Sequence, residues 1–497
     1  MATQLQDVQP VVPPSKPQPL SLGLRRVEPK RLSLHLLVAL VVGSMIGSGI
    51  FSLPQNMAAS AGAGAILIGW LITGVGMLSL ALVYQTLSNR MPAMDNGVFA
   101  YARALGGDFL GFNSAWGYWI SAWIGNVSYL VILFAALSYF FPLFGEGNNK
   151  AAIAGASVVL WSLHWMILRG MRTAARANAL TTVAKVVPLL LFIGVLIASF
   201  QRETFMVDFW GTPALGSTLD QVKSTMLVTV WVFIGIEGAS VFSARAAERA
   251  NVGRATVIGF VITLILLIAV SLLSLGILRQ PELAALKNPS MAGVLEAAVG
   301  PWGAVLISIG LIISVGGALL AWTLLAAESV FTPAKEKVMP MALAEESTRS
   351  VPANALWLTN GCIQLFLLLT LYSSASYLAL ISLATSMILL PYLFSSVYAL
   401  KLTWQGETYA GHRALQVRDM AIATVAALYC GWLLYAAGPK YLLLSALLYA
   451  PGSLIYLGTL KTRQGQPLSG PETGVLIIIW AAAIYAGRML WSGTLTL

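Results

Sequence analysis

Long runs of apolar residues alternate with short polar segments along almost the whole chain. Most runs have about twenty residues or more, the length that an α-helix needs to cross a membrane. They lie at about 34–56, 61–86, 109–141, 150–168, 176–200, 222–243, 254–278, 301–333, 353–372, 375–400, 418–437, 440–460 and 474–491. The pattern predicts an all-α polytopic membrane protein with 12 or 13 spans. The run at 474–491 is the weakest candidate, because it is short and carries Arg488 near its end.

The composition agrees with this pattern and excludes other classes of protein. Of the 497 residues, 58% are hydrophobic and only 10% are charged, whereas about 25% are charged in a typical soluble domain. A soluble globular protein, a disordered chain and a coiled coil are therefore excluded. Residues 1–33 differ from the rest, because they are rich in proline and contain no apolar run. They are expected to form a disordered cytosolic tail and not a secretory signal.

The basic residues indicate an orientation. The net charge is +10, from 29 Lys and Arg against 19 Asp and Glu residues. If the N-terminus lies in the cytosol, the segments on the inner side hold 21 of the basic residues and those on the outer side hold six. Cytoplasmic loops of membrane proteins collect Lys and Arg. The excess charge therefore reflects topology and not a nucleic-acid partner, and with thirteen spans the C-terminus is expected outside.

Two of the predicted spans contain glycine clusters near their middle, at 43–49 in the first and at 235–238 in the sixth. Glycine costs roughly 1 kcal/mol in a helix interior, and a membrane helix must satisfy its own backbone groups. Close packing through small residues is one explanation. Two clusters in corresponding positions of two five-helix halves instead favour the interrupted helices of a transporter. Such breaks can bind a carboxylate at exposed N–H groups and a cation at freed carbonyls, which points to amino acids.

The same segments carry a family resemblance. Residues 43–51, with Pro54 after them, resemble the first helix of the amino acid–polyamine–organocation transporters, and residues 231–240 resemble their sixth. Residues 115–126 and the pair Trp322-Thr323 resemble the basic amino acid antiporters of that superfamily. The resemblance covers roughly residues 30–490.

This resemblance implies a fold of two inverted five-helix repeats with broken first and sixth helices, followed by two or three additional helices. The repeats are expected at 34–200 and 201–402, and the additional spans at 403–497.

The resemblance also implies a function. It implies a secondary transporter in a bacterial inner membrane that exchanges extracellular arginine for intracellular ornithine by alternating access and so serves arginine fermentation. Exchange of lysine or of other cationic amino acids, and proton-coupled uptake of basic amino acids, remain open. No cofactor is expected, and a homodimer is a candidate assembly. The sequence contains no Walker loop, metal-ligand spacing or recognisable nucleophile–base set, so neither an ATP-driven pump nor an enzyme is expected. A channel would not need two central breaks.

Matching residue by residue, the resemblance implies a substrate site at the two breaks. Its substrate-binding positions are Met45, Gly47, Ser48, Gly49, Ser121, Ala122, Asn126, Trp231, Ile234 and Trp322, and its gate positions are Tyr118, Glu237 and Tyr392. From the residues alone, Trp231 and Trp322 can receive a guanidinium or ammonium group, worth about 2 kcal/mol when desolvated. Asn126 can accept a hydrogen bond from a cation without adding charge. Either Trp, taken singly, is more often a packing residue.

Three ionisable residues fall deep within predicted spans: Lys185, Glu237 and Glu328. A charge at the bilayer centre costs at least about 2.5–3.5 kcal/mol, so a functional role is the first expectation. Glu237 is expected to tune the gate. Lys185 resembles the residue that replaces a sodium ion in sodium-independent members of the superfamily, so transport is expected not to need sodium. Glu328 fits a transport role and a structural ion pair equally well.

Overall fold

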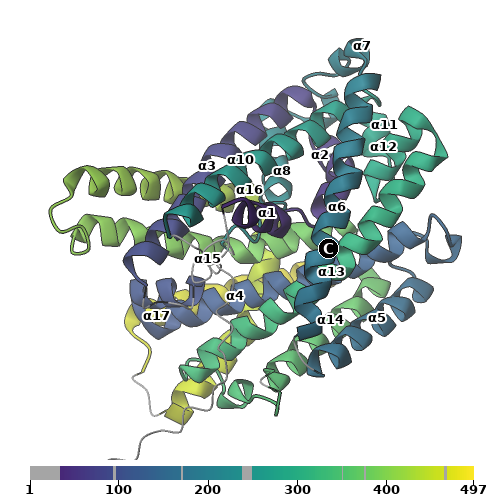
Figure 1. The fold of residues 1–497 in the computed structure, drawn as a ribbon. Helices are drawn as coiled ribbons and strands as arrows, with labels where there is room; N and C mark the ends of the chain where they lie inside the picture. The colour runs from purple at the N-terminus through teal and green to yellow at the C-terminus, as the bar shows by residue number, and fades with distance from the viewer. Residues whose placement is uncertain are drawn as a thin grey trace, which may run out of the picture.

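The computed structural model describes residues 34–92, 94, 97–169, 172–237, 249–349, 351–373, 376–463 and 467–496. All regular elements in these ranges are helices (Figure 1). The long ones are α1 (Leu34–Met45), α2 (Gly49–Ala58), α3 (Ala63–Arg90), α4 (Gly97–Leu137), α5 (Lys150–Leu168), α6 (Arg172–Ser199), α8 (Thr218–Trp231), α10 (Arg249–Ser274), α12 (Ser290–Val299), α13 (Pro301–Lys335), α14 (Ala353–Ser373), α15 (Tyr377–Gln405), α16 (Arg413–Arg463) and α17 (Gly470–Trp491). Short helices are α7 (Arg202–Met206), α11 (Gln280–Ala284), η1 (Pro142–Phe144), η2 (Pro213–Leu215) and η4 (Met341–Ala344).

Eleven of the thirteen predicted apolar segments lie largely along one helix each, the first covers α1 and α2, and the sixth begins in α8 and continues into the turns after it. Within the described ranges, nine helices are long and apolar enough to cross a membrane: α3, α4, α5, α10, α13, α14, α15, α16 and α17. The all-α polytopic fold is thereby confirmed. The predicted tail at 1–33 and the end of the sixth segment, from Gly238 onward, lie outside the described residues. The division into inverted repeats stays a prediction.

The first predicted helix break is present, and the described part of the second shows a helix that ends near the predicted position. α1 ends at Met45 and α2 begins at Gly49, with no helix between them. α8 ends at Trp231 and is followed by turns through Glu237. Within these turns Gly235 has a φ of 106°, a conformation that a residue with a Cβ rarely adopts. The first glycine cluster therefore interrupts its helix as the pattern predicts, and the described part of the second lies in the turns that follow α8.

Two further glycines bend long helices. Gly438, with a φ of 69°, divides α16 at the point where the sequence predicts the boundary between 418–437 and 440–460. Gly107, with a φ of 82°, divides α4 and separates residues 97–105 from the apolar part. This first part of α4 was not among the predicted spans, because its polar residues interrupt the apolar run. The expected start of the third span at 109 is correct for the apolar part alone.

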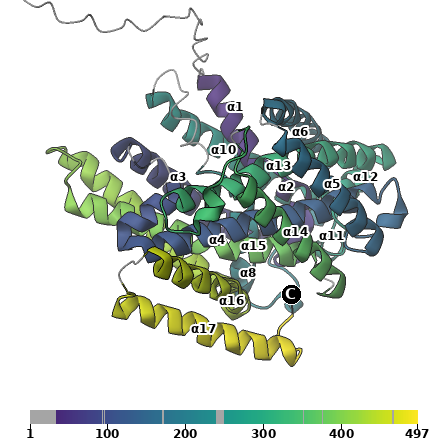
Figure 2. The same cartoon turned by 90° about the horizontal axis from the view of Figure 1, so that it is seen from below.

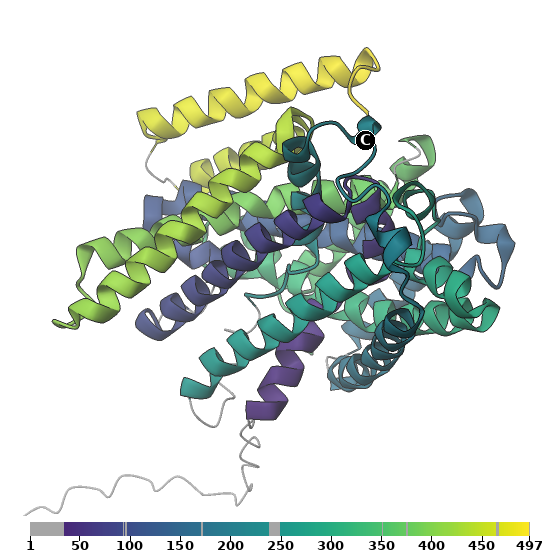
Figure 3. The ribbon, with the colours of Figure 1, turned by 90° about the horizontal axis from the view of Figure 1, so that it is seen from above.

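α4 and α15 form the centre of the bundle, and almost all apolar residues of α4 are buried (Figures 1 and 2). The two helices approach closely at Gly117, where an added Cβ would lie 2.7 Å from the backbone oxygen of Met387. Small residues allow such close contact between membrane helices. α17 instead lies at the edge, packed on α16 with most of its surface exposed (Figure 3).

A polar cluster joins the end of α3 to the loop between α15 and α16. The Arg90 guanidinium lies 3.4 Å from the centre of the Tyr409 ring and 3.4 Å from the carboxylate of Asp419. The Tyr409 hydroxyl donates a 3.1 Å hydrogen bond to the same carboxylate. Burial and the neighbouring Asp419 charge raise the pKa of Tyr409 to about 12. The cluster ties α3 to α16 at one end of the bundle.

Candidate functional site

A cavity of about 430 Å³, including its opening to solvent, lies where the two helix breaks meet. Eight of the ten predicted substrate-binding residues line it: Met45, Gly47, Gly49, Ser121, Ala122, Trp231, Ile234 and Trp322. The residues that line the cavity carry no charged side chain. A charged ligand must therefore be received by backbone dipoles, hydroxyl groups and aromatic faces.

The other two predicted binding residues are fully buried beside lining residues. The Ser48 and Tyr377 hydroxyl oxygens are 3.2 Å apart and share a hydrogen bond. The Asn126 amide nitrogen donates a 3.3 Å hydrogen bond to the Thr323 hydroxyl. The Asn126 amide oxygen has no hydrogen-bond partner among the described residues. Ser48 and Asn126 thus support the cavity wall from behind.

The first helix break presents a helix N-terminus to the cavity. Gly49 and Ile50, the first two residues of α2, both line it. The first N–H groups of a helix have no partner within the helix, and the helix dipole makes this end positive. Such an end attracts an anionic group. The arrangement is suited to a carboxylate.

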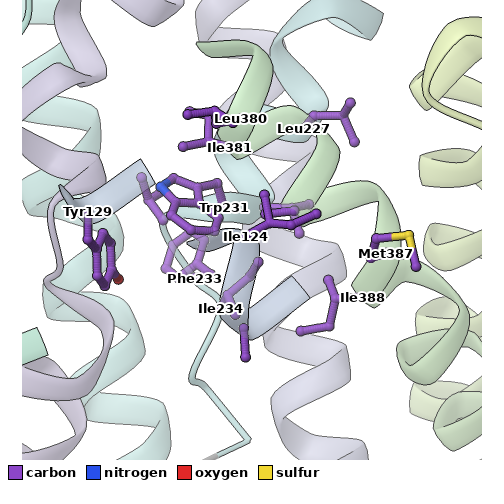
Figure 4. Packing of buried hydrophobic residues seen from close by; sticks show 14 of the residues in the cluster. Ile124, Tyr129, Leu227, Trp231, Phe233, Ile234, Leu380, Ile381, Met387 and Ile388 are labelled. Carbon is purple, nitrogen blue, oxygen red and sulfur yellow. The ribbon is translucent and has the colours of Figure 1, made fainter. Parts of the chain in front are cut away.

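Glycines make room for two aromatic rings at the cavity. The Tyr129 and Trp231 rings meet edge to face with their centres 6.0 Å apart (Figure 4). A Cβ on Gly47 would lie 2.9 Å from the Tyr129 hydroxyl oxygen, closer than real Cβ contacts come. A Cβ on Gly49 would lie 2.8 Å from Trp231 Cδ1, and one on Gly125 would lie 3.0 Å from Trp231 Cη2. The glycines therefore admit the rings as well as interrupting the helix.

Four lining residues were not predicted: Ile50, Gly125, Tyr129 and Val232. Ile50 and Val232 adjoin predicted residues in the chain. Gly125 and Tyr129 follow Ser121 at intervals of four residues, which places all three on one face of α4. This helical spacing was the available signal for Gly125 and Tyr129.

The three predicted gate residues meet through the Glu237 carboxylate. The Tyr118 hydroxyl donates a 2.8 Å hydrogen bond to Oε1, and the Tyr392 hydroxyl donates a 2.9 Å bond to Oε2. The backbone N–H of Gly235 donates to Oε2 at 3.2 Å. Hydrogen bonds to a charged group contribute about 1.5–3 kcal/mol each. Three distant parts of the chain are thus joined at one acidic side chain.

Tyrosines of the same two helices lie at both ends of the cavity. Tyr118 on α4 and Tyr392 on α15 contact Glu237, whereas Tyr377 on α15 contacts Ser48 at the first break. Tyr129 on α4 adjoins the same break. Eleven residues separate Tyr118 from Tyr129, about 16 Å along a helix. The cavity lies between these two levels.

Two further sequence expectations have different outcomes. The backbone at Lys185 belongs to α6, but its side chain lies outside the described residues. Glu328 is exposed and accepts a 3.2 Å hydrogen bond from the Thr332 hydroxyl. The side chain of Glu328 thus faces outward from α13, and its role stays a prediction. The described part of the chain holds no group of three His, Cys, Asp or Glu residues that could bind a metal.

Comparisons with known proteins identify the family. A family model described as amino acid permease matches residues 32–463. An arginine/ornithine antiporter of Pseudomonas aeruginosa is 57% identical over 94% of this chain and 99% of its own length. An L-lysine transport protein of Corynebacterium glutamicum is 42% identical over 94% of this chain and 97% of its own length. An arginine/agmatine antiporter of Chlamydia pneumoniae is 41% identical over 88% of this chain and 91% of its own length.

These matches span nearly the full chain and agree with the resemblance seen at the two breaks. They identify a multi-pass membrane transporter and not an enzyme. The chain belongs to the amino acid permease family.

Proposed function

We propose that this protein exchanges arginine for ornithine across the membrane by alternating access. The observation that carries the proposal is the uncharged cavity between two helix breaks, which combines a helix N-terminus with two tryptophan rings. The similarity to the arginine/ornithine antiporter of Pseudomonas aeruginosa supports the choice of substrates. Exchange is the proposed mode because both substrates carry about one positive charge at neutral pH, so a one-for-one exchange needs only the two gradients.

The chemistry of the cavity suits an amino acid with a cationic side chain. The α-carboxylate is proposed to bind at the start of α2, where Gly49 and Ile50 offer backbone N–H groups. The α-amino group is proposed to bind near Ile234, where carbonyls follow the end of α8. The side-chain cation then meets Trp322 and the Ser121 hydroxyl. Without a carboxylate in the lining, the cation is not held by an ion pair and can leave again.

Tyr118, Glu237 and Tyr392 are proposed to gate the cavity on its inner side. Opening this end requires the breaking of the hydrogen bonds that the two tyrosines donate to Glu237. Their cost of about 1.5–3 kcal/mol each lies within the range that a bound substrate can offset. Trp231 is proposed to move with the sixth-helix break when the outer side opens.

The remaining proposals concern the setting of the transporter. The N-terminus is proposed to lie in the cytosol and the protein in the inner membrane of a bacterium, where it serves arginine fermentation. The proposed repeats occupy 34–200 and 201–402, with additional spans at 403–497. Lys185 is proposed to supply the positive charge that sodium provides in other transporters, so exchange is expected to proceed without sodium.

The proposal is tested by uptake of radiolabelled arginine into proteoliposomes in sodium-free buffer. Vesicles are loaded with ornithine, lysine or agmatine, or left empty. We expect rapid uptake into ornithine-loaded vesicles and little uptake into empty ones. Equal uptake into empty vesicles would refute exchange, and a requirement for added sodium would refute the role of Lys185.

A second candidate function is exchange of lysine, favoured by the similarity to the L-lysine transport protein of Corynebacterium glutamicum. Faster arginine uptake into lysine-loaded than into ornithine-loaded vesicles would favour it. Proton-coupled uptake is distinguished by imposing an inward proton gradient on empty vesicles, which accelerates uptake only if protons are cotransported.

A further inference from the structure

Tyr129 is a cavity residue whose hydroxyl faces the first helix break. Its side chain is only 6% exposed, and it lines the cavity together with Gly47 and Gly49. A Cβ on Gly47 would lie 2.9 Å from the hydroxyl oxygen, which places that oxygen directly against the break. The edge-to-face contact with Trp231 fixes the ring in this position. The hydroxyl therefore lies beside the start of α2.

The Tyr129 hydroxyl differs from those of the other tyrosines around the cavity. Tyr118 and Tyr392 donate to Glu237, and Tyr377 shares a hydrogen bond with Ser48. No described residue forms a hydrogen bond with the Tyr129 hydroxyl. The Tyr129 oxygen is not one of the side-chain atoms that are sealed from solvent without a partner, and the residue lines the cavity. The hydroxyl can therefore donate a hydrogen bond to a ligand in the cavity.

We propose that Tyr129 donates a hydrogen bond to the α-carboxylate of the bound amino acid and so distinguishes amino acids from the corresponding decarboxylated amines. The inference rests on the proposed function, in which the carboxylate binds at the start of α2. Gly49 and Ile50 would offer backbone N–H groups from one side of the carboxylate, and Tyr129 a hydroxyl from another. The chain already uses this chemistry at Glu237, where a phenol donates to a carboxylate at 2.8 Å.

The expected selectivity follows from the donor. A site that is built to hydrogen-bond a substrate group rejects an analogue that lacks the group, because its polar partner is then left unpaired. Agmatine is arginine without the carboxylate. Loss of the Tyr129 hydroxyl should therefore weaken binding of arginine and ornithine, while binding of agmatine is unchanged or strengthened.

The test compares the affinities for arginine and for agmatine in the purified full-length protein. Tyr129→Phe removes the hydroxyl and keeps the ring against Trp231. Tyr449→Phe is the matched control, because it removes a buried hydroxyl that bonds the Met387 backbone oxygen outside the cavity. Calorimetry or scintillation proximity gives the dissociation constants. Tyr129→Met is a second variant that lacks the hydroxyl. Thermal unfolding shows whether each variant is folded.

We expect Tyr129→Phe to weaken arginine binding by about tenfold to a hundredfold, the range for a hydrogen bond to a charged group. Agmatine binding should change by less than about twofold, and Tyr449→Phe should leave the ratio of the two affinities unchanged. If the ratio of arginine to agmatine affinity is the same in Tyr129→Phe, Tyr129→Met and the wild-type protein, this inference is overturned and the proposed function is not. Failure of the wild-type protein to bind arginine or ornithine would instead overturn the proposed function.

Discussion

Gly49→Ala places a methyl group in space that the sixth-helix break already occupies. The added Cβ would lie 2.8 Å from Trp231 Cδ1 and 2.9 Å from Val232 Cγ1, whereas ordinary contacts begin near 3.4 Å. Both neighbours line the cavity, and because both contacts are too short, each must give way by roughly 0.5 Å. On its other edge, the Trp231 ring abuts Gly125, which limits its retreat.

The size of the effect follows from two opposing contributions. Forcing an extra methyl group into a packed interior costs about 1–3 kcal/mol. Alanine at the start of α2 recovers up to about 1 kcal/mol through its better helix propensity. The net cost therefore lies between about 0 and 3 kcal/mol and centres near 1.5 kcal/mol, which corresponds to about a tenfold change in an equilibrium constant. Because the shifted groups form the cavity wall, we expect the affinity for arginine to fall by this factor.

The assay is arginine binding to purified protein, with thermal unfolding measured in parallel. Gly361→Ala on α14 is the matched control, because no heavy atom lies within 4 Å of its added Cβ. The control should keep the wild-type affinity. Wild-type affinity in a folded Gly49→Ala protein would refute the argument that Gly49 is required for the close approach of Trp231.

Three further predictions concern other parts of the molecule. Glu237→Gln removes the charge that Tyr118 and Tyr392 bond, so the exchange rate in proteoliposomes should change at least tenfold; an unchanged rate would contradict the gate. Trp322→Ala should weaken arginine binding by up to about thirtyfold through loss of a cation–π contact, and Trp322→Phe should keep most of the affinity; equal losses in both would contradict that contact. The raised pKa of Tyr409 favours the neutral phenol in the folded protein, so its contribution to stability is complete below pH 10 and is lost towards about pH 12. The midpoint temperature of thermal unfolding of Tyr409→Phe should therefore fall less steeply over this pH range than that of the wild-type protein.

The helices and their breaks were accessible from the sequence because a membrane leaves few alternatives. An apolar run of about twenty residues must satisfy its backbone groups within a helix, and glycines near the centre mark the points where it does not. Gly235 shows this directly, since its φ of 106° is rarely adopted by other residues. The breaks in turn located most of the cavity, since Gly47, Gly49 and Trp231 belong to them.

The contacts between distant helices were less accessible. Tyr129 fits an ordinary apolar face of α4, and its contact with Gly47 arises only after the third helix packs against the first. Glu328 shows the same limit, because its sequence neighbours are apolar whereas its side chain faces outward from α13. Hydropathy reports the average environment of a segment, whereas the role of a residue depends on the face that it occupies.

The placement of four tyrosines at two levels of α4 and α15 bears on how tightly the membrane stays sealed. No tyrosine hydroxyl is shared between the Glu237 contacts and the Ser48 contact. In the proposed gating, either set can therefore separate while the other stays intact. A single side chain that served both levels would release both at once and open a continuous aqueous path. Protons would then flow down a membrane potential worth about 2.3 kcal/mol per charge at 100 mV. The separation of the two levels along α4 would thus prevent a proton leak through this protein.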